Sequence, residues 1–573
     1  MISKNTLLTD EQIRINFQRW LCQAECSDIS DPDVVKELNA IKDDREKIRK
    51  AFCRNLTFGT GGLRGIIGAG TNCMNVHTVA GASQGVAEHI KRHVSGEGGR
   101  VAVSYDSRRK SQLFARIACS VFAANGLKVY LFPRMMPTPC LSFAVRSLQC
   151  AAGIMITASH NPCQYNGYKV YGSDGCQITP ETAEEIYEEI AKIDVFADVR
   201  TEDFERSCRK GMIDYVSEQV HTEFIEAVKK ESVLGSKEAD RGIPIVYTPL
   251  NGTGCEPVLR VLKESGYYNI TVVKEQQEED ENFSTCSYPN PEIREAMILG
   301  IEYAKRKNAA LVLATDPDCD RAGAAVNDGQ GDYVLLSGNE TGILLLDYIC
   351  RQRIANGTMP EHPIAVKTIV TTELGQRIAA YYGVETINVL TGFKFIGEQV
   401  SCLEAEGRVE DFIFGYEESC GYLSGTYVRD KDGVGAALLI CEMTAFYAHQ
   451  GTSLWERLDE LYQMFGYCLN TLHTYGFEEP EEMGRVIEEI CQNSVSFGGM
   501  KIEKVTDYRS GFAGLPKSNV VKLLLENDSS VIIRPSGTEA KLKAYVSVCG
   551  KDKGKVRMQE QRIVTGLEQF LRL

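Results

Sequence analysis

Four polar loops contain side chains whose types and spacing suit chemistry, and the first is Thr157–Pro162. In this loop Ser159 and His160 follow the apolar run 151–156, which predicts a buried strand. A serine at the point where such a strand emerges is held rigidly and stays reachable, as a nucleophile requires. Ser159 is therefore a candidate nucleophile, although hydroxyl residues also fill ordinary loops. The dipeptide Asn166-Gly167 predicts a turn after this loop.

The second loop carries Asp316, Asp318 and Asp320, followed by Arg321. Three carboxylates at alternate positions after an apolar run are hard oxygen ligands that suit Mg²⁺. An EF-hand would need Gly and Glu where this chain has Arg321 and Asn327, so that motif is excluded. A solvated acidic turn remains the alternative. Arg321 can either neutralise the carboxylates or hold a phosphate beside the metal.

The third loop contains Glu417 and Ser419 at the end of a predicted strand. Acceptors of this kind bind the neighbouring hydroxyl groups of a sugar, and helix capping is the competing interpretation. Lys431 follows shortly afterwards, next to Asp432, which is a plausible helix cap. Lys431 can contact phosphate or move a proton, whereas most lysines at such positions face water.

The fourth loop combines an arginine, two hydroxyls and a glycine: Arg534, Ser536, Gly537 and Thr538. This combination can hold a phosphate dianion, and an ordinary polar turn is the alternative. A fifth, glycine-rich stretch at 58–65 presents Arg64, and it can also be a simple connector. Together the loops supply a nucleophile, a cation site, a polyol site and a separate phosphate site. A phosphatase needs only the first two, so the set favours a phosphosugar mutase.

Alternating strands and helices must position these loops. Apolar runs predict strands in three successive groups, at 101–105, 127–132 and 151–156, at 243–247, 270–274 and 310–314, and at 364–370, 386–390 and 412–414. Helices are predicted between them, for example at 112–125. Each group ends in one polar loop, which indicates three similar α/β units with functional loops at the carboxyl ends of strands.

The two ends of the chain differ from this pattern. A capping box at Thr9 and Gln12 predicts a first helix to about residue 22, and a second helix is expected over 32–52. After a helix at 453–465 and a less regular stretch, strands at 520–525 and 530–533 and a helix at 556–571 predict an antiparallel α+β domain.

The predicted fold class is therefore α/β, with three consecutive similar α/β domains containing mixed sheets and a smaller C-terminal α+β domain around one central cleft. An N-terminal helical extension covers residues 1–55. Domains 1 to 4 are expected at 56–210, 211–328, 329–455 and 456–573.

Size, charge and composition narrow the class of protein. The chain has 573 residues and a net charge of −15, which argues against a nucleic-acid partner. Its 20 cysteines follow no metal-binding or disulfide spacing, so they are predicted to be reduced thiols. We find neither a signal peptide nor a segment of membrane-spanning length, and we expect a cytoplasmic protein without a membrane partner.

From about residue 58 to the C-terminus, the chain resembles the α-D-phosphohexomutase family, in its phosphoglucomutase/phosphomannomutase branch. The motifs TASHNP, Asp-x-Asp-x-Asp-Arg, Glu-Glu-Ser and RPSGTE occur in the family's order and at domain-scale spacing. The resemblance implies that Ser159 carries a phosphoryl group and that its phosphate binds Mg²⁺ together with the three aspartates. The phosphoryl group then moves to a sugar monophosphate through a 1,6-bisphosphate.

The resemblance also implies roles for the remaining candidates. Arg64, His160, Lys169 and Arg321 match positions around the reacting phosphate, and Lys169 and Lys431 are the candidates for proton transfer. Glu417 and Ser419 match residues that bind the sugar's 3- and 4-hydroxyls. The phosphate that is not transferred is assigned to the fourth loop: Arg534, Ser536, Gly537 and Thr538.

Two positions depart from the family pattern, because Cys319 stands where a small residue such as Gly or Ala is more usual and Cys420 stands where Gly or Phe is. Glucose phosphate is the first choice of substrate, with glucose 1,6-bisphosphate as activator. A mannose or pentose phosphate is the runner-up. A catalytically silent relative that only binds sugar phosphates is the rival from another class. We expect a monomer or a weak homodimer.

Overall fold

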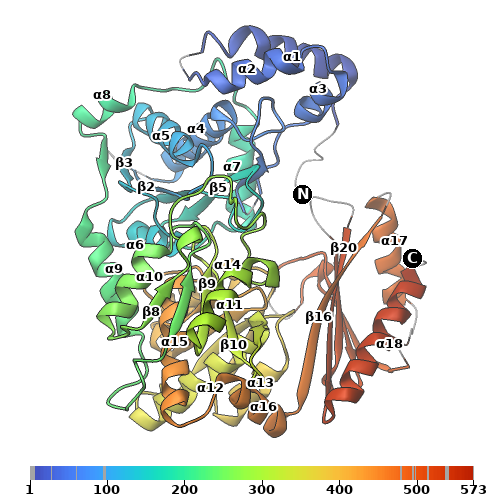
Figure 1. Ribbon diagram of the computed structural model, residues 1–573. Helices are drawn as coiled ribbons and strands as arrows, with labels where there is room; N and C mark the ends of the chain where they lie inside the picture. Colours follow the sequence, from blue (N-terminus) through green and yellow to red (C-terminus); the bar gives the residue numbers. More distant parts are fainter. Residues whose placement is uncertain are drawn as a thin grey trace.

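The computed structural model describes residues 7–571 except 28, 60, 95–98, 478–479, 493–495, 497–498, 513–514 and 536–540. The described residues form four sheets, and the first includes β6 (Ile213–Tyr215), which lies just beyond the expected end of domain 1 at residue 210. Figure 1 shows domains 1 to 3 following one another from the N-terminal helices, with the C-terminal domain beside them. The three α/β domains and the C-terminal α+β domain predicted from the sequence are confirmed.

The first three sheets share one four-stranded core. Its strand order is β5-β4-β2-β3 in domain 1, β10-β9-β7-β8 in domain 2 and β15-β14-β12-β13 in domain 3. In each core three strands run parallel and the first runs antiparallel to its neighbour. Each polar loop of these domains joins the same two strands, namely β4 to β5, β9 to β10 and β14 to β15. All three loops therefore occupy the same position in a repeated supersecondary structure.

Each of these loops also contains one non-glycine residue in the left-handed region. These residues are Ser159 with φ of 52°, Cys319 with φ of 50° and Cys420 with φ of 57°. Such a conformation strains a residue with a side chain, and it persists only where the surroundings impose it. Cys319 and Cys420, which depart from the family pattern, thus occupy positions where glycine fits the backbone without strain.

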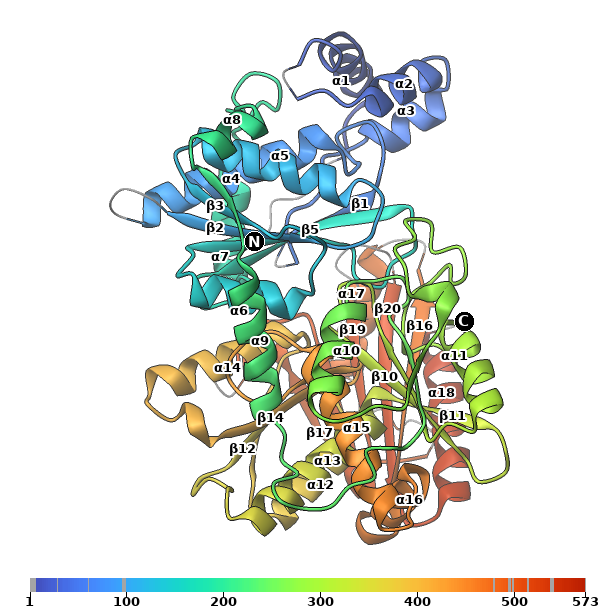
Figure 2. The same cartoon turned by 60° about the vertical axis from the view of Figure 1, so that its left-hand side comes forward.

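The elements of domain 1 are the strands β1 (Leu63–Ile66), β2 (Arg100–Tyr105), β3 (Lys128–Leu131), β4 (Ala152–Ile156), β5 (Tyr165–Gly172) and β6 (Ile213–Tyr215), and the helices α4 (Val76–His93), α5 (Ser111–Ala124), α6 (Thr138–Ser147), α7 (Pro180–Ile190) and α8 (Phe204–Arg209). Helices α4 and α7 pack on each other, whereas α6 packs on β2, β4 and α9. In Figure 2, α4 and α5 lie on the side of the sheet away from domain 2, and α6 lies toward it.

The elements of domain 2 are α9 (Glu218–Lys230), β7 (Ile245–Thr248), α10 (Cys255–Glu264), β8 (Ile270–Val272), α11 (Arg294–Lys307), β9 (Leu311–Thr315), β10 (Ala322–Asn327) and β11 (Tyr333–Leu336). Those of domain 3 are α12 (Gly338–Asn356), β12 (Ile364–Thr368), α13 (Leu374–Tyr381), β13 (Glu385–Val389), α14 (Phe393–Ala405), β14 (Phe412–Glu417), β15 (Gly421–Leu423) and α15 (Gly433–His449).

Helix α15 joins domains 2 and 3, because it packs on α9, α10, β9 and β10 as well as on α12 and β15. Its residues from Gly433 to Tyr447 are buried, as expected for an apolar helix without a polar face. Asp432 caps it, as predicted, by accepting a hydrogen bond from the Val434 amide. At its start the Gly433 amide donates to the Cys319 carbonyl over 3.2 Å, and a Cβ on Gly433 would stand 2.6 Å from that oxygen. Helix α15 therefore supports the aspartate loop directly.

The N-terminal extension consists of α1 (Asp10–Gln23), α2 (Pro32–Ile41) and α3 (Arg45–Phe52). The predicted capping box at Thr9 is present. The prediction of one helix over 32–52 was wrong, because Asp44 accepts a hydrogen bond from the Lys47 amide and starts a new helix.

Helix α16 (Leu454–Phe465) packs on α12 and α13 of domain 3 and leads into domain 4. Domain 4 contains β16 (Tyr467–Gly476), α17 (Pro480–Gln492), β17 (Ile502–Asp507), β18 (Val521–Leu525), β19 (Ser530–Pro535), β20 (Lys541–Gly550) and α18 (Lys553–Leu571). Its sheet has the antiparallel order β16-β20-β19-β18-β17. The stretch expected to be irregular contains β16, α17 and β17. Alternating burial along β18, with Val521, Leu523 and Leu525 inside, matches a sheet with one covered face.

A small apolar cluster joins domain 4 to domain 3. Ile369, Val370 and Leu390 of domain 3 pack against Tyr508, Val520 and Ile532 of domain 4. Beside it Lys522 forms an ion pair with Glu373, at the start of α13. This interface places the end of β19, and hence the fourth polar loop, beside domain 3.

Two further predictions were wrong. Asn166 and Gly167 do not form a turn but lie inside β5, where a Cβ on Gly167 would stand 2.4 Å from the Thr157 carbonyl oxygen. The glycine therefore serves close strand packing rather than chain reversal. The prediction that all cysteines are thiols fails for Cys468 and Cys549, which form a disulfide between β16 and β20.

In the part of the chain that the structure describes, no helix combines the length and apolar character needed to span a membrane.

Candidate active site

Ser159 lies just beyond β4 and is only 3% exposed. Its amide donates to the Thr157 hydroxyl over 2.8 Å, and Thr157 in turn donates to Asp106 over 2.6 Å. These contacts hold the left-handed backbone at Ser159 and fix the direction of its side chain. The local structure thus gives the rigid, strand-end serine that the sequence predicted.

Arg108 holds the rest of the Ser159 loop, although the sequence analysis did not single it out. Its buried guanidinium donates to four carbonyl oxygens, those of Ser159, Asn161, Pro162 and Tyr165. The Asp106 carboxylate lies 3.2 Å from its Nε atom. Only the planar, five-donor group of arginine can serve so many acceptors at once. A polar sequence directly after strand β2, Asp106-Ser107-Arg108, was the signal for this role.

The aspartate loop meets the serine loop at one hydrogen bond. Ser159 Oγ donates to Asp316 Oδ2 over 2.8 Å, although the two residues are 157 positions apart. The amides of Asp320 and Arg321 donate to Asp316 Oδ1 over 3.1 and 3.0 Å. The nucleophile predicted in domain 1 and the carboxylates predicted in domain 2 therefore belong to one site.

Two lysines from different domains face the carboxylates. Lys169, on β5, lies 2.7 Å from Asp318 Oδ2 and 3.0 Å from Asp320 Oδ2, and Lys431 lies 3.1 Å from Asp320 Oδ2. Burial raises the pKa of Asp320, but these lysines and Arg321 outweigh it and hold the pKa below its usual value. For Lys169 burial lowers the pKa, and the charges of Asp318 and Asp320 more than reverse this. Both lysines are therefore charged at neutral pH.

The chemistry of the triad fits a hard divalent cation. Carboxylate oxygens of Asp316, Asp318 and Asp320, one from each, all lie within 4.8 Å of one another, and all three residues are buried. Asp318 Oδ1 and Asp320 Oδ1 are buried without a hydrogen-bond donor. Burial, and then the charges of Asp320 and Asp318, raise the pKa of Asp316 well above its usual value. Buried, underpartnered oxygen atoms of this kind are what Mg²⁺ binds, so the triad can hold a metal ion.

His160 and Arg64 lie on the serine side of the site. His160 Nδ1 is 3.3 Å from Ser159 Oγ, and Arg64 donates to the Asn161 side chain over 3.2 Å. Burial, and then the charges of Arg321 and Arg64, lower the pKa of His160 well below its usual value. Gly62, with φ of 74°, lets the chain approach β5 closely where β1 begins to pair with it, since a Cβ there would stand 1.8 Å from the Tyr168 carbonyl oxygen.

On the other side of the triad, Arg321 forms an ion pair with Glu292, which the sequence analysis missed. No motif surrounds Glu292, so only the fold reveals this partner. Glu417, at the end of β14, is 5% exposed. Burial raises its pKa, although the charges of Lys431 and Arg321 and a hydrogen bond from Ser419 act to lower it. Glu417 thus lies within electrostatic reach of the lysine and arginine that face the aspartates.

The fourth loop is only partly described. Arg534 ends β19, whereas Ser536, Gly537 and Thr538 lie outside the described residues. Arg534 forms a hydrogen bond with Tyr545. Burial and the nearby charges of Glu418 and Glu417 raise the pKa of this tyrosine. A cavity of about 150 Å³ where domains 2, 3 and 4 meet is lined by Glu292, Glu418 and Tyr545 among others. Arg534 is therefore beside the Glu417 loop, and its contact with Tyr545 does not extend to Ser159.

Comparison with known proteins supports this architecture. Models of phosphoglucomutase/phosphomannomutase α/β/α domains I, II and III match residues 55–196, 222–329 and 337–465. A phosphoglucomutase from Staphylococcus haemolyticus is 35% identical over 515 residues, which are 87% of this chain and 91% of the relative.

Two solved structures share the fold. The Paramecium phosphoprotein pp63/parafusin, a phosphoglucomutase in an open form, has a TM-score of 0.69 at 17% identity and covers 90% of this chain and 95% of its own. A phosphoglucomutase/phosphomannomutase family protein from Burkholderia thailandensis has a TM-score of 0.67 at 18% identity, with coverages of 90% and 97%.

Fold and site together define a phosphohexomutase, an enzyme of the isomerase class. The chain belongs to the α-D-phosphohexomutase family, in its phosphoglucomutase/phosphomannomutase branch.

Proposed function

We propose that this enzyme interconverts glucose 1-phosphate and glucose 6-phosphate through a phosphorylated Ser159. The observation that carries the proposal is the 2.8 Å hydrogen bond between Ser159 Oγ and Asp316 Oδ2. This bond links the Ser159 hydroxyl of the TASHNP loop to the aspartate triad, which can hold a cation. Curated relatives with the name phosphoglucomutase, at 34–35% identity over most of the chain, support glucose as the sugar.

In the proposed reaction, the bond between phosphorus and Ser159 Oγ breaks while a bond forms between phosphorus and a free hydroxyl of the sugar monophosphate. The hydroxyl loses its proton, and Ser159 Oγ gains one. The resulting glucose 1,6-bisphosphate then turns over, and Ser159 takes the other phosphoryl group by the reverse step. Every bond that breaks in the first half is therefore restored in the second.

The residues of the chain have distinct roles in this proposal. Ser159 is the phosphoryl carrier, and Arg64 and Arg321 balance the charge of the phosphoryl group. Lys169 and Lys431 are charged, so they act as charge-neutralising groups and proton donors rather than as general bases. Neutral His160, next to Ser159 Oγ, is the nearer acceptor for a proton.

Asp316, Asp318 and Asp320 would hold Mg²⁺, which when bound neutralises the negative charge of the transferred phosphoryl group. The donor set favours Mg²⁺ because all its protein ligands are hard oxygen atoms. Glu417 and Ser419 are assigned to the sugar hydroxyls. Arg534, together with Ser536, Gly537 and Thr538, is assigned to the phosphate that is not transferred.

The experiment is to compare the turnover of glucose 1-phosphate, mannose 1-phosphate and ribose 1-phosphate, each with its matching bisphosphate. We expect the highest kcat/KM with glucose 1-phosphate. Intact mass and peptide mapping should find a single phosphate on Ser159, which glucose removes and glucose 1,6-bisphosphate restores.

The Ser159→Ala variant should carry no phosphate and have no mutase activity, whereas the neighbouring Thr157→Ser variant should keep both. A higher kcat/KM for ribose 1-phosphate would assign the enzyme to pentose phosphates instead. An active Ser159→Ala variant would refute the phosphoserine mechanism itself.

A further inference from the structure

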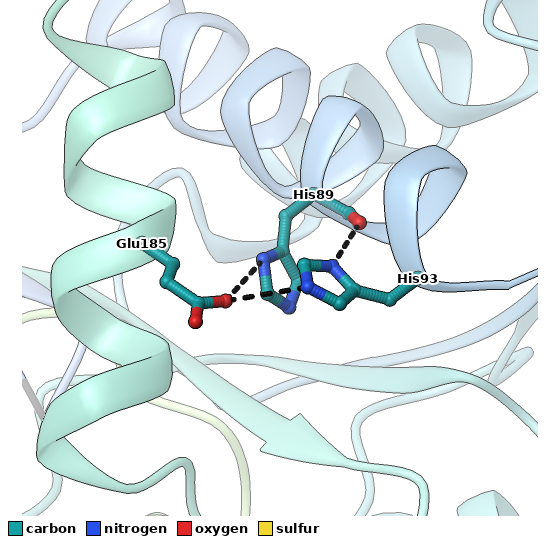
Figure 3. A group of neighbouring side chains, drawn as sticks. All are labelled: His89, His93 and Glu185. Carbon is teal, nitrogen blue, oxygen red and sulfur yellow. Dashed lines mark hydrogen bonds and ion pairs between the residues drawn. The ribbon is translucent and has the colours of Figure 1, made fainter.

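A second cluster of metal-ligand residues lies on domain 1, apart from the aspartate triad. His89 and His93 occupy the last two turns of α4, and Glu185 lies on the adjacent helix α7 (Figure 3). A spacing of four residues places both imidazoles on the same face of α4. Both rings approach the same carboxylate oxygen, because His89 Nδ1 and His93 Nε2 are each 3.5 Å from Glu185 Oε2.

These two distances suit a bound metal better than hydrogen bonds. An N–H···O bond of good geometry measures about 2.9 Å between its heavy atoms. In a tetrahedral zinc site with bonds of about 2.1 Å, neighbouring ligand atoms lie about 3.4 Å apart. The two nitrogen-to-oxygen distances of 3.5 Å match the edges of such a tetrahedron. One possible ligand atom from each of the three residues lies within 4.8 Å of the other two, so the three side chains form one cluster.

The hydrogen bond made by the second nitrogen of His93 orients that ring for metal binding. His93 Nδ1 lies 2.9 Å from the carbonyl oxygen of His89, so it is Nδ1 that carries the hydrogen. In the neutral ring, the lone pair is then on Nε2, which faces Glu185 (Figure 3). Two acceptors, Nε2 and a carboxylate oxygen, thus face each other, and a cation between them would satisfy both. Metal-binding histidines commonly use a backbone carbonyl in this way.

The charges around the cluster leave Glu185 available. Arg92 pairs with Glu189, and Lys91 pairs with Glu88. Among the described residues, the only lysine, arginine or histidine side chains within ion-pair distance of Glu185 are those of the two histidines. The side chain of His89 is 16% exposed, and those of His93 and Glu185 are 55% exposed, so an ion can enter from solvent.

We propose that His89, His93 and Glu185 form a binding site for one divalent transition-metal ion of the Zn²⁺ type, with a solvent molecule as the fourth ligand. Two imidazoles and one carboxylate favour Zn²⁺ over Mg²⁺, which prefers oxygen ligands alone. The ion would tie the end of α4 to α7. Helix α4 lies on the side of the domain 1 sheet away from domain 2 (Figure 2), and α7 packs on α4, so this site is separate from the phosphoryl-transfer site.

The test is calorimetric titration of the full-length enzyme with Zn²⁺ in excess Mg²⁺, after alkylation of the accessible thiols under native conditions. The variants are His93→Gln and Glu185→Gln, both at exposed positions that the fold tolerates. We expect one equivalent of Zn²⁺ to bind the unsubstituted enzyme and each substitution to weaken this binding by at least about tenfold. The matched control is His449→Gln, which removes another exposed histidine–glutamate pair and should leave binding unchanged.

Two further measurements separate this site from others. Co²⁺ bound here should give ligand-field bands without the thiolate-to-cobalt charge-transfer band of a cysteine site. Zn²⁺ should raise the unfolding temperature of the unsubstituted enzyme and not that of Glu185→Gln. Equal Zn²⁺ affinity in the unsubstituted enzyme and both variants, or the absence of a bound equivalent, would overturn the proposal. Since the variants leave Ser159 and the aspartates intact, loss of Zn²⁺ binding with unchanged mutase activity distinguishes this site from the proposed function.

Discussion

Thr138, in the first turn of α6, binds Asp318 through two hydrogen bonds. Its amide donates to the Asp318 carbonyl over 2.9 Å, and its hydroxyl donates to Asp318 Oδ2 over 3.0 Å. The Thr138 hydroxyl and Asp318 Oδ2 are both buried. Domain 1 therefore orients a proposed metal ligand of domain 2, in addition to supplying the proposed nucleophile.

The Thr138→Val variant tests this contact, because it removes the hydroxyl and keeps nearly the same shape. Outer partners of metal ligands typically contribute about 10- to 100-fold in metal affinity or activity. We expect a Mg²⁺ titration of mutase activity to shift to higher concentration by on the order of tenfold. Thr138→Ser, which restores a hydroxyl, should titrate like the unsubstituted enzyme. Identical Mg²⁺ dependence in all three proteins would show that the contact has no such role.

Arg108→Gln should disrupt the Ser159 loop. The substitution leaves buried Asp106 without its cation and removes donors from four carbonyl oxygens. Removal of one partner of a buried ion pair commonly costs about 3–5 kcal/mol. We expect a lower unfolding midpoint in denaturant and a large loss of kcat. Exposed Arg109 is the matched control, and Arg109→Gln should change neither quantity.

His77 should make stability depend on pH. It is fully buried between Trp20 and Phe196, and neither of its ring nitrogens has a hydrogen-bond partner. Burial lowers its pKa from 6.5 to about 4. Between these values the unfolded chain binds a proton that the folded protein does not, so stability falls as the pH is lowered through this range. The expected loss at His77 is about 3 kcal/mol, from about 1.4 kcal/mol per pH unit.

The unfolding midpoints of the unsubstituted protein and of His77→Phe, measured from pH 7 to pH 4, test this prediction. His77→Phe should lose less stability across the range, because phenylalanine does not titrate. His362→Gln changes an exposed histidine and should keep the steeper profile. A His77→Phe profile that parallels that of the unsubstituted protein would mean that other groups cause the pH dependence.

Arg534→Gln should weaken substrate binding if Arg534 holds the phosphate that is not transferred. A charge-assisted hydrogen bond contributes about 1.5–3 kcal/mol, which corresponds to about a 10- to 100-fold increase in KM. We expect a smaller change in kcat, since the proposed contact is remote from the transferred group. Arg509, paired with Asp507 in the same domain, is the control. If KM for glucose 1-phosphate stays constant in Arg534→Gln, the assignment is wrong.

The sequence alone determined the succession of three α/β units and a different C-terminal domain, and it located the candidate reactive loops. Apolar runs located β2, β3, β4, β7, β9, β12 and β14 to within a few residues, because a buried strand must be apolar on both faces. Ser159 and the aspartate triad were singled out because several polar loops occur together in the order of the family's motifs, although each loop alone is a weak signal. The role of Gly167 was misread, because a glycine is required there by the close approach of neighbouring segments that are distant in the sequence.

Only the tertiary structure decided which of these residues meet. No local pattern links Ser159 to Asp316, Lys169 to Asp318, or Thr138 to Asp318, because each pair is separated by about 150 residues or more. Arg108 and Glu292 act through buried contacts that depend on loop paths, and the Cys468–Cys549 disulfide depends on the pairing of β16 with β20. Backbone propensity and hydrophobic pattern act over a few residues, whereas electrostatic pairing in a site depends on distances that only the packed domains define.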